Sequence, residues 1–212
     1  MARTGRPRGF DKAEAVEKAM RVFWQFGYEA TSLAQLKQAM GGISTASFYA
    51  AFGSKEGLFR EATAHYLATH GQVTASLRDP SVAPREAIEL VLRRSTRMQT
   101  EATHPKGCLV VLTASTCAPE NGHIQALLAE ERARNRVALH ACVERAIKAG
   151  DLPARANVAG LAATFETFLV GLSSQARDGV PLAALEDAIT KIMGVWDACA
   201  GSTASTAPAF ER

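Results

Sequence analysis

The 212-residue sequence lacks the apolar run of about 20 residues that a membrane-spanning helix requires. Its most apolar stretch, residues 158–172, is interrupted by Glu166. The arginines near the start are followed by Asp11 and Glu14 rather than by an apolar segment, so we expect no signal peptide. Cysteine is scarce and forms no CxxC pair, which excludes a zinc ribbon and a disulfide framework; the four residues are Cys108, Cys117, Cys142 and Cys199. These absences predict a cytoplasmic protein with reduced thiols that makes no use of a membrane.

Charge is unevenly distributed, although the net formal charge is only +3. Residues 1–60 carry nine Lys or Arg against five Asp or Glu, whereas the rest of the chain is slightly acidic. Arg3, Arg6 and Arg8 form a basic arm ahead of the first expected helix. Such an arm favours nucleic acid as a partner, and a merely solvating basic tail is the alternative.

Strand signals are nearly absent, because the one β-branched apolar cluster, residues 109–112, is short. Apolar residues recur instead at helical spacing, so the predicted fold class is all-α with about nine helices. The first helix is expected over residues 11–25, with Asp11 as its N-cap and Gly27 as its stop.

Serines and glycines mark the next helix boundaries. Two short helices are expected to begin near Ser32 and Ser44, separated by Gly41-Gly42, and Ser54 caps a long helix that extends to Val73. Two short helices around a glycine turn, held by a longer helix on each side, are typical of a helix-turn-helix unit. The remaining helices are expected over residues 84–101, 107–117, 124–149, 157–176 and 182–198.

The strongest motif is GYEATSL at residues 27–33, followed by ISTASFYAAFGSKEGLF at residues 43–59. It closely resembles the DNA-binding domain of TetR/AcrR-family transcriptional regulators, and GRPRGF at residues 5–10 resembles that family's basic arm. The family pattern has one glycine in the turn, where this chain has two. The resemblance implies an N-terminal three-helix DNA-binding domain and a helical effector-binding and dimerisation bundle. We therefore assign residues 1–53 to the arm and helix-turn-helix domain, 54–199 to the bundle, and 200–212 to a tail that lacks fixed structure or is added sequence.

The second short helix must fit a major groove about 12 Å wide, which favours small outward side chains. Phe48 and Phe52 are expected to point inward and Tyr49 to reach a phosphate. Helix starts and Lys55 favour further phosphate contacts, although Thr31 and Ser44 could be caps alone and Lys55 an unengaged surface charge. Because this helix has no Arg, Asn, Gln or Lys, we expect specificity to need its neighbours. The predicted DNA-binding residues are Arg3, Arg6, Arg8, Thr31, Ser32, Gln35, Lys37, Ser44, Thr45, Ala46, Ser47, Tyr49 and Lys55.

Cys108 lies in the sequence HPKGCL, where Lys106 and a helix start favour the thiolate. The Gly-Cys-Leu run resembles a subgroup of the family that senses oxidants or electrophiles through cysteine. A buried cysteine acting as a small hydrophobe, and a metal ligand together with His104, are the alternatives.

An effector cavity is expected among residues 84–101, 107–117 and 155–175, and by resemblance the last two helices form the dimer interface. The candidate ligand-binding residues are Arg94, Met98, Cys108, Leu112, Thr113, Thr116 and Phe165. The candidate dimerisation residues are Phe168, Leu172, Leu185, Ile189, Ile192 and Trp196.

These features together predict a sequence-specific, dimeric transcriptional regulator. It would repress by binding a near-palindromic operator in double-stranded DNA, and an unknown small molecule or a cysteine modification would release it. We expect no cofactor, no catalytic residue and no metal site. Two alternatives remain: an enzyme that uses Cys108 as nucleophile with His104 as base, and an all-helical protein-interaction adaptor.

Overall fold

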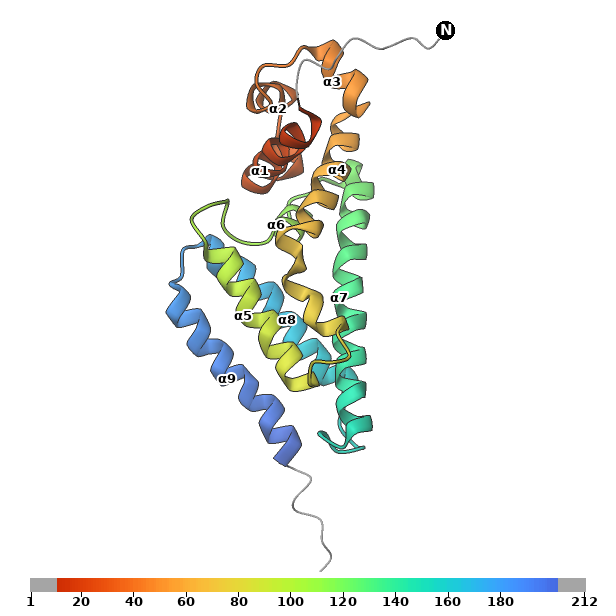
Figure 1. Ribbon diagram of the computed structural model, residues 1–212, viewed down its shortest axis with the longest axis vertical. Coiled ribbons are helices and arrows are strands. Elements are labelled where there is room, and N and C mark those ends of the chain that lie inside the picture. Colours follow the sequence, from red (N-terminus) through yellow and green to blue (C-terminus); the bar gives the residue numbers. More distant parts are fainter. Residues whose placement is uncertain (1–10, 202–212) are drawn as a thin grey trace, which may run out of the picture.

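The computed structural model describes residues 11–201, and within this range every regular element is a helix. Figure 1 shows the arrangement: α1 to α3 form one end of an elongated molecule, α4 descends from that end, and α5, α7, α8 and α9 make up the other end. The predicted all-α fold class is confirmed. The elements are α1 (Lys12–Ala30), α2 (Leu33–Ala39), α3 (Thr45–Phe52), α4 (Lys55–Ala68), η1 (His70–Arg78), α5 (Pro84–Thr100), α6 (Leu109–Ala114), η2 (Pro119–Asn121), α7 (Gly122–Ala149), α8 (Val158–Arg177) and α9 (Leu182–Gly201), where η denotes a 3₁₀ helix.

Side-chain caps begin the first four helices. The Asp11 side chain accepts hydrogen bonds from the amides of Ala13 and Glu14 and so starts α1. Ser32, Ser44 and Ser54 each accept a hydrogen bond from the amide three residues further on, and Ser32 forms a reciprocal capping box with Gln35. These caps satisfy backbone N–H groups that have no partner inside the helix.

Some helix boundaries differ from those expected. The helical span of α1 reaches Ala30, but Gly27 interrupts it with φ 79° and ψ 173°, as its predicted role as a stop requires. The long helix expected to extend to Val73 ends at Ala68, because Thr69 leaves helical geometry with φ −115° and ψ −89°, and the chain continues as η1. The helix expected over residues 107–117 is reduced to α6, because Gly107 has φ +83° and cannot join it.

Two hydrophobic cores stabilise the molecule. The upper core, at the α1–α3 end in Figure 1, joins α1 to α4 with α6 and the start of α7, and it contains seven buried aromatic residues: Phe23, Trp24, Tyr28, Phe48, Phe52, Phe59 and Tyr66. The lower core joins η1, α5, α7, α8 and α9 through mainly aliphatic side chains, with Phe165 and Trp196 as its buried aromatics.

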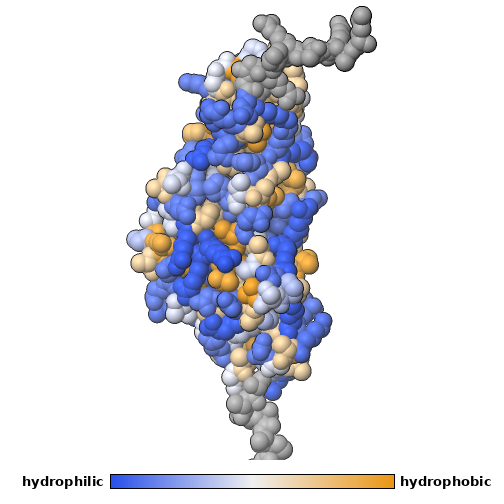
Figure 2. All heavy atoms as spheres, viewed as in Figure 1, coloured by the Kyte–Doolittle hydropathy of each residue, from blue (hydrophilic) through white to orange (hydrophobic). Residues whose placement is uncertain are grey.

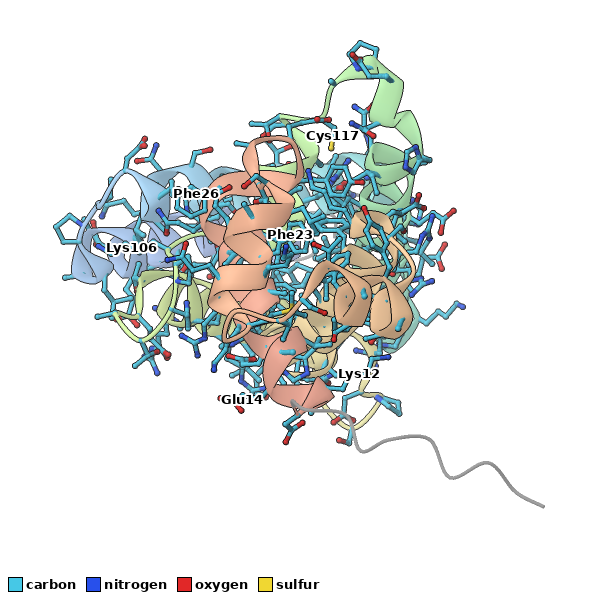
Figure 3. All side chains as sticks on the ribbon, turned by 90° about the horizontal axis from the view of Figure 1, so that it is seen from above. Lys12, Glu14, Phe23, Phe26, Lys106 and Cys117 are labelled. Carbon is cyan, nitrogen blue, oxygen red and sulfur yellow. The ribbon has the colours of Figure 1, made fainter. Side chains whose placement is uncertain are left out.

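The upper core does not follow the boundary expected between residues 53 and 54. Leu58 and Phe59 of α4, together with Leu109 of α6, are fully buried in the same cluster as Phe23 of α1. Figure 3, which looks onto this end, shows Phe23 among the packed side chains, whereas Phe26 is 51% exposed. The packing thus joins the first three helices to α4 and α6 in one core. The division into domains at residues 53 and 54 stays a prediction. The expected tail overlaps the end of α9 at residues 200–201, and its remainder lies outside the described residues.

Candidate functional site

The turn between α2 and α3 contains two consecutive glycines, Gly41 and Gly42, where the family pattern has one. Gly41 and Gly42 have φ of 86° and 76°, which side-chain-bearing residues rarely adopt. Their amides donate to the carbonyls of Gln38 and Lys37 at 3.1 and 2.9 Å. The extra residue is thus absorbed by two left-handed positions that also close the end of α2.

Helix α3 has an apolar inner face and an outer face of small side chains. Phe48 and Phe52 are buried in the upper core, as predicted from their spacing. Thr45, Ala46 and Ser47 are exposed, and Tyr49 is 50% exposed. The outer face is therefore free to approach a partner while two phenylalanine rings hold the helix in place.

Polar side chains at the start of α3 are linked to each other. The Lys37 ammonium donates to the Thr45 hydroxyl at 2.7 Å, which ties α2 to α3. The Ser44 hydroxyl accepts from the Ser47 amide (3.0 Å) and donates to the Ser47 hydroxyl (2.9 Å). Because the linked groups are exposed or half-exposed, they can exchange these bonds for contacts with a ligand such as a phosphate.

Thr31 does not lie where the sequence placed it. It is buried, and its hydroxyl donates to the Gly27 carbonyl at 2.6 Å, so the adjacent Ser32 caps α2 in its place. The Gln35 side chain accepts from the Ser32 amide at 2.7 Å and completes that cap while remaining exposed.

Lys55 is half-buried at the start of α4, with its ammonium 4.3 Å from the centre of the Tyr28 ring. Burial lowers the pKa of Lys55, and the nearby Glu29 carboxylate opposes that change. A cation–π contact thus holds this lysine against Tyr28, and its contact with a phosphate stays a prediction. Arg3, Arg6 and Arg8 lie outside the described residues.

A cavity of about 360 Å³ lies between the two cores. Tyr66, Met98 and Val110 line it from the upper core, and Leu169 lines it from the lower core side. The expected ranges do supply walls, and α4, η1 and α7 add others. Figure 2 shows apolar side chains exposed in the middle of one face, among hydrophilic ones.

Only two of the seven candidate ligand-binding residues, Met98 and Cys108, line this cavity. Arg94 is exposed on α5, and Phe165 is fully buried in the lower core beside Trp196. The short α6 directs Val110 and Val111 toward the cavity, so Leu112, Thr113 and Thr116 lie outside its lining. Sequence spacing missed these valines, because it does not fix the rotation of a helix this short.

Cys108 is half-buried at the end of the segment that joins α5 to α6. The Tyr66 hydroxyl donates to its sulfur at 3.4 Å, and burial together with this cysteine raises the pKa of Tyr66. The preceding Gly107 carbonyl accepts from the Trp24 indole at 3.0 Å.

His104 stacks on Trp24, with ring centres 4.5 Å apart, and its Nδ1 lies 3.0 Å from the Pro105 carbonyl. Its Nε2 is buried without a hydrogen-bond partner, 3.6 Å from the Glu101 carboxylate. Within residues 11–201, no group of three or more His, Cys, Asp or Glu could hold a metal ion. Segment 104–108 thus connects the cavity to α1 through Trp24.

The candidate dimerisation residues divide into two sets. Leu172, Leu185, Ile189 and Trp196 are buried by the chain itself, because they form the contact of α8 and α9 with the lower core. Phe168 and Ile192 are half-exposed and line an apolar groove between α8 and α9, together with small residues such as Gly171, Ala184 and Ala188.

Comparisons with known proteins agree on both halves of the chain. Residues 15–62 match the family model "Bacterial regulatory proteins, tetR family", and residues 84–192 match "Tetracyclin repressor-like, C-terminal domain". The HTH-type transcriptional repressor ComR of Escherichia coli K12 is 31% identical over 195 residues, which cover 91% of each chain.

Solved structures extend this similarity. A cysteine mutant of the TetR family transcriptional regulator CifR, complexed with 26-bp double-strand operator DNA, is 43% identical, with a TM-score of 0.84 over 90% of this chain and all of that one. The reduced form of E. coli NemR is 19% identical with a TM-score of 0.66, over 85% of this chain and 93% of that one, which shows the fold alone.

Proposed function

The chain belongs to the TetR family of bacterial regulatory proteins, and on this premise we propose that it is a transcriptional repressor that binds a near-palindromic operator as a homodimer. The observation that carries the proposal is the outer face of α3, where small exposed side chains lie beside Lys37 and Tyr49. Such a face fits a major groove, and the groove-side residues of a two-fold dimer repeat after about 34 Å, one turn of DNA.

The apolar groove between α8 and α9 supports the homodimer. It contains Phe168 and Ile192, whose half-exposed side chains a second copy would cover. A two-fold pairing buries the same surface on both chains and places the two α3 helices symmetrically.

The proposed contacts with DNA fall into two kinds. Ser32, Ser44, Ser47, Tyr49 and Lys55 would bind phosphates, since they lie at helix starts or carry a donor near the edge of the α3 face. Gln35, Lys37, Thr45 and Ala46 would meet base edges, and Arg3, Arg6 and Arg8 would reach a minor groove.

Fluorescence anisotropy of duplexes from the DNA upstream of the gene, at two salt concentrations, tests this function. Specific binding that weakens steeply with salt supports it, whereas equal affinity for a random duplex contradicts it. Because Lys37 is assigned to a base edge, Lys37→Met should weaken binding and lose discrimination at one base pair. A loss that is uniform across sequences, with the salt slope reduced by about 1, would make Lys37 a phosphate contact instead. Lys148→Met on the exposed face of α7, remote from α3, is the matched control.

Release of the operator would follow occupation of the cavity or modification of Cys108. Cys108 is half-buried and lines the cavity wall, which favours the second route, because a group attached there would occupy the cavity. A coupling of about 1–3 kcal/mol suffices to weaken operator binding 5- to 150-fold. Treatment with N-ethylmaleimide should label Cys108 in the folded protein and lower operator affinity; an unlabelled Cys108 contradicts this route.

A regulator fits better than an enzyme that uses Cys108 as nucleophile. His104, the base that a Cys108 enzyme would need, is stacked on Trp24. None of the helices in residues 11–201 is both long and apolar enough to cross a membrane. We place the repressor in the cytoplasm, where its DNA partner is.

A further inference from the structure

Two buried polar atoms beside the cavity have no hydrogen-bond partner. They are Oε1 of Gln99 on α5 and the hydroxyl of Ser173 on α8, and both residues line the cavity while being almost wholly buried. An unpaired buried polar group is costly, so each calls for a partner that is not part of the chain. We propose that this cavity binds a neutral, largely apolar molecule with a hydroxyl group that pairs with Gln99 and Ser173, an inference that rests on the proposed effector-released repressor.

Gln99 and Ser173 belong to the same end of the cavity. The Gly107 amide donates to the Gln99 carbonyl at 2.9 Å. A Cβ built on Gly107 would lie 2.9 Å from the Ser173 carbonyl oxygen. Gly107 therefore lies between the two residues, directly before Cys108. We place the ligand's polar group at this end, where the backbones of Gln99 and Ser173 come together around Gly107.

Two sides of the wall are apolar, and they define the body of the ligand. Met98, Val110 and Val111 line it from α5 and α6, and Leu169 and Val170 line it from α8. A volume of about 360 Å³ is at the small end of the usual range for ligand cavities. The cavity thus fits one compact hydrocarbon body with its polar group at the Gly107 end.

Charged side chains on the wall already have partners, which argues against a charged ligand. Arg78 donates to Asn135 (3.1 Å) and Arg132 to the Val110 carbonyl (3.5 Å), while Glu131 pairs with Arg134 (2.9 Å) and Glu166 with Arg136 (3.1 Å). An ion that enters the cavity loses its hydration, a cost that a neutral molecule avoids, and an ammonium group would find both wall carboxylates already ion-paired.

A hydroxyl is the group that suits both residues. An amide end and a serine hydroxyl each offer a donor and an acceptor, and an alcohol can donate to one while accepting from the other. A ketone or an ether only accepts, and a hydrocarbon leaves both atoms unpaired.

A matched series of four probes tests the proposal by calorimetry on the full chain without DNA: 4-phenylbutan-1-ol, butylbenzene, 4-phenylbutanoate and 4-phenylbutylammonium. The alcohol should bind roughly three- to tenfold more tightly than the hydrocarbon, as expected for one or two hydrogen bonds, and more tightly than either ion. Tighter binding of an ion, or no binding of the alcohol up to its solubility limit, contradicts the proposal.

Variants of Gln99 and Ser173 test whether these two residues cause the preference for the alcohol over the hydrocarbon. Gln99→Leu and Ser173→Ala should each reduce the ratio of alcohol to hydrocarbon affinity about threefold or more, and both should fold because the atom removed is unpaired. Thr96→Val is the control, since its hydroxyl is also buried and unpaired but its residue does not line the cavity. A ratio that stays unchanged in both test variants overturns the assignment. Because no DNA is present, a failure of operator binding would leave these ratios unaffected and is recognised separately.

Discussion

The upper and lower cores differ in composition and in what they connect. Seven buried aromatic side chains fill the upper core, where Phe59 meets Phe23 and Tyr28 edge to face at 5.0 and 5.1 Å. The lower core is mainly aliphatic, with Phe165 and Trp196 6.2 Å apart. The packed rings join α1, α3 and α4, and Leu109 and Val110 of α6 are buried in the same core, whereas the lower core supplies the opposite wall of the cavity. A ligand between them acts on the junction of two bodies.

Polar contacts reinforce the connection of α1 to the cavity side. The Trp24 indole donates to the Gly107 carbonyl at 3.0 Å, and the Glu29 carboxylate accepts from the Ala118 amide at 2.8 Å and from Asn121 at 2.9 Å. Arg177 of α8 donates to the carbonyls of both Gln25 and Lys106. A shift of segment 104–108 would therefore displace α1 through these hydrogen bonds.

The largest effects on stability should come from replacing one buried leucine in each core by alanine. Leu58→Ala in the upper core and Leu92→Ala in the lower core both remove a side chain that is at most 1% exposed, and each should lower the free energy of unfolding by about 2–5 kcal/mol. Urea unfolding measures the loss. Operator affinity of the folded variants should fall only for Leu58→Ala, and an equal fall for both would mean that the cores are not separate.

Substitution of the two tryptophans, one in each core, gives a second comparison. Trp24→Phe leaves the Gly107 carbonyl without its indole donor and should cost about 1–3 kcal/mol of stability. It should also reduce the loss of operator affinity that follows N-ethylmaleimide labelling of Cys108. Trp196→Phe, in the lower core, should leave that loss unchanged. If both variants respond alike to labelling, segment 104–108 does not carry the effect.

The smallest effect is expected at Glu29. Its pKa is lowered chiefly by the hydrogen bond from the Ala118 amide, and also by Asn121. A carboxyl whose folded-state pKa is depressed stabilises the fold above its ordinary pKa, and this contribution is lost as the pH falls through the folded-state pKa.

Glu29→Gln should therefore cost roughly 1 kcal/mol at pH 7, and the difference from the wild type should shrink below about pH 4.3. Unfolding curves at pH 7 and below pH 4 measure it, and a difference independent of pH would exclude the carboxylate as the cause.

Local features of the fold could be predicted from the sequence, and tertiary ones could not. Asp11, Ser44 and Ser54 cap helices because capping depends on a few neighbouring residues, and the spacing of Phe48 and Phe52 fixes the inner face of α3. Thr31 and Ser32 were both candidates for one cap, and only packing decides between them.

The polar residues of the cavity could not be predicted, because no local sequence pattern marks them. Gln99 and Ser173 are distant in sequence, and tertiary folding brings the backbone of each next to Gly107. The half-exposed face of α8 and α9 could likewise be separated from their buried face only once α5 and the lower core were in place.

Helix α6 shares the upper core with α3, whose outer face is the proposed DNA-reading surface. Hydrogen exchange of the native protein, with and without operator DNA, tests it most directly, because residues that open together gain protection together. Amides of α6 should gain the same protection factor as those of α1 to α3 when the operator binds, while amides of α9 gain less. If α6 instead follows α9, or shows no change while α1 to α3 become protected, the single upper body does not exist.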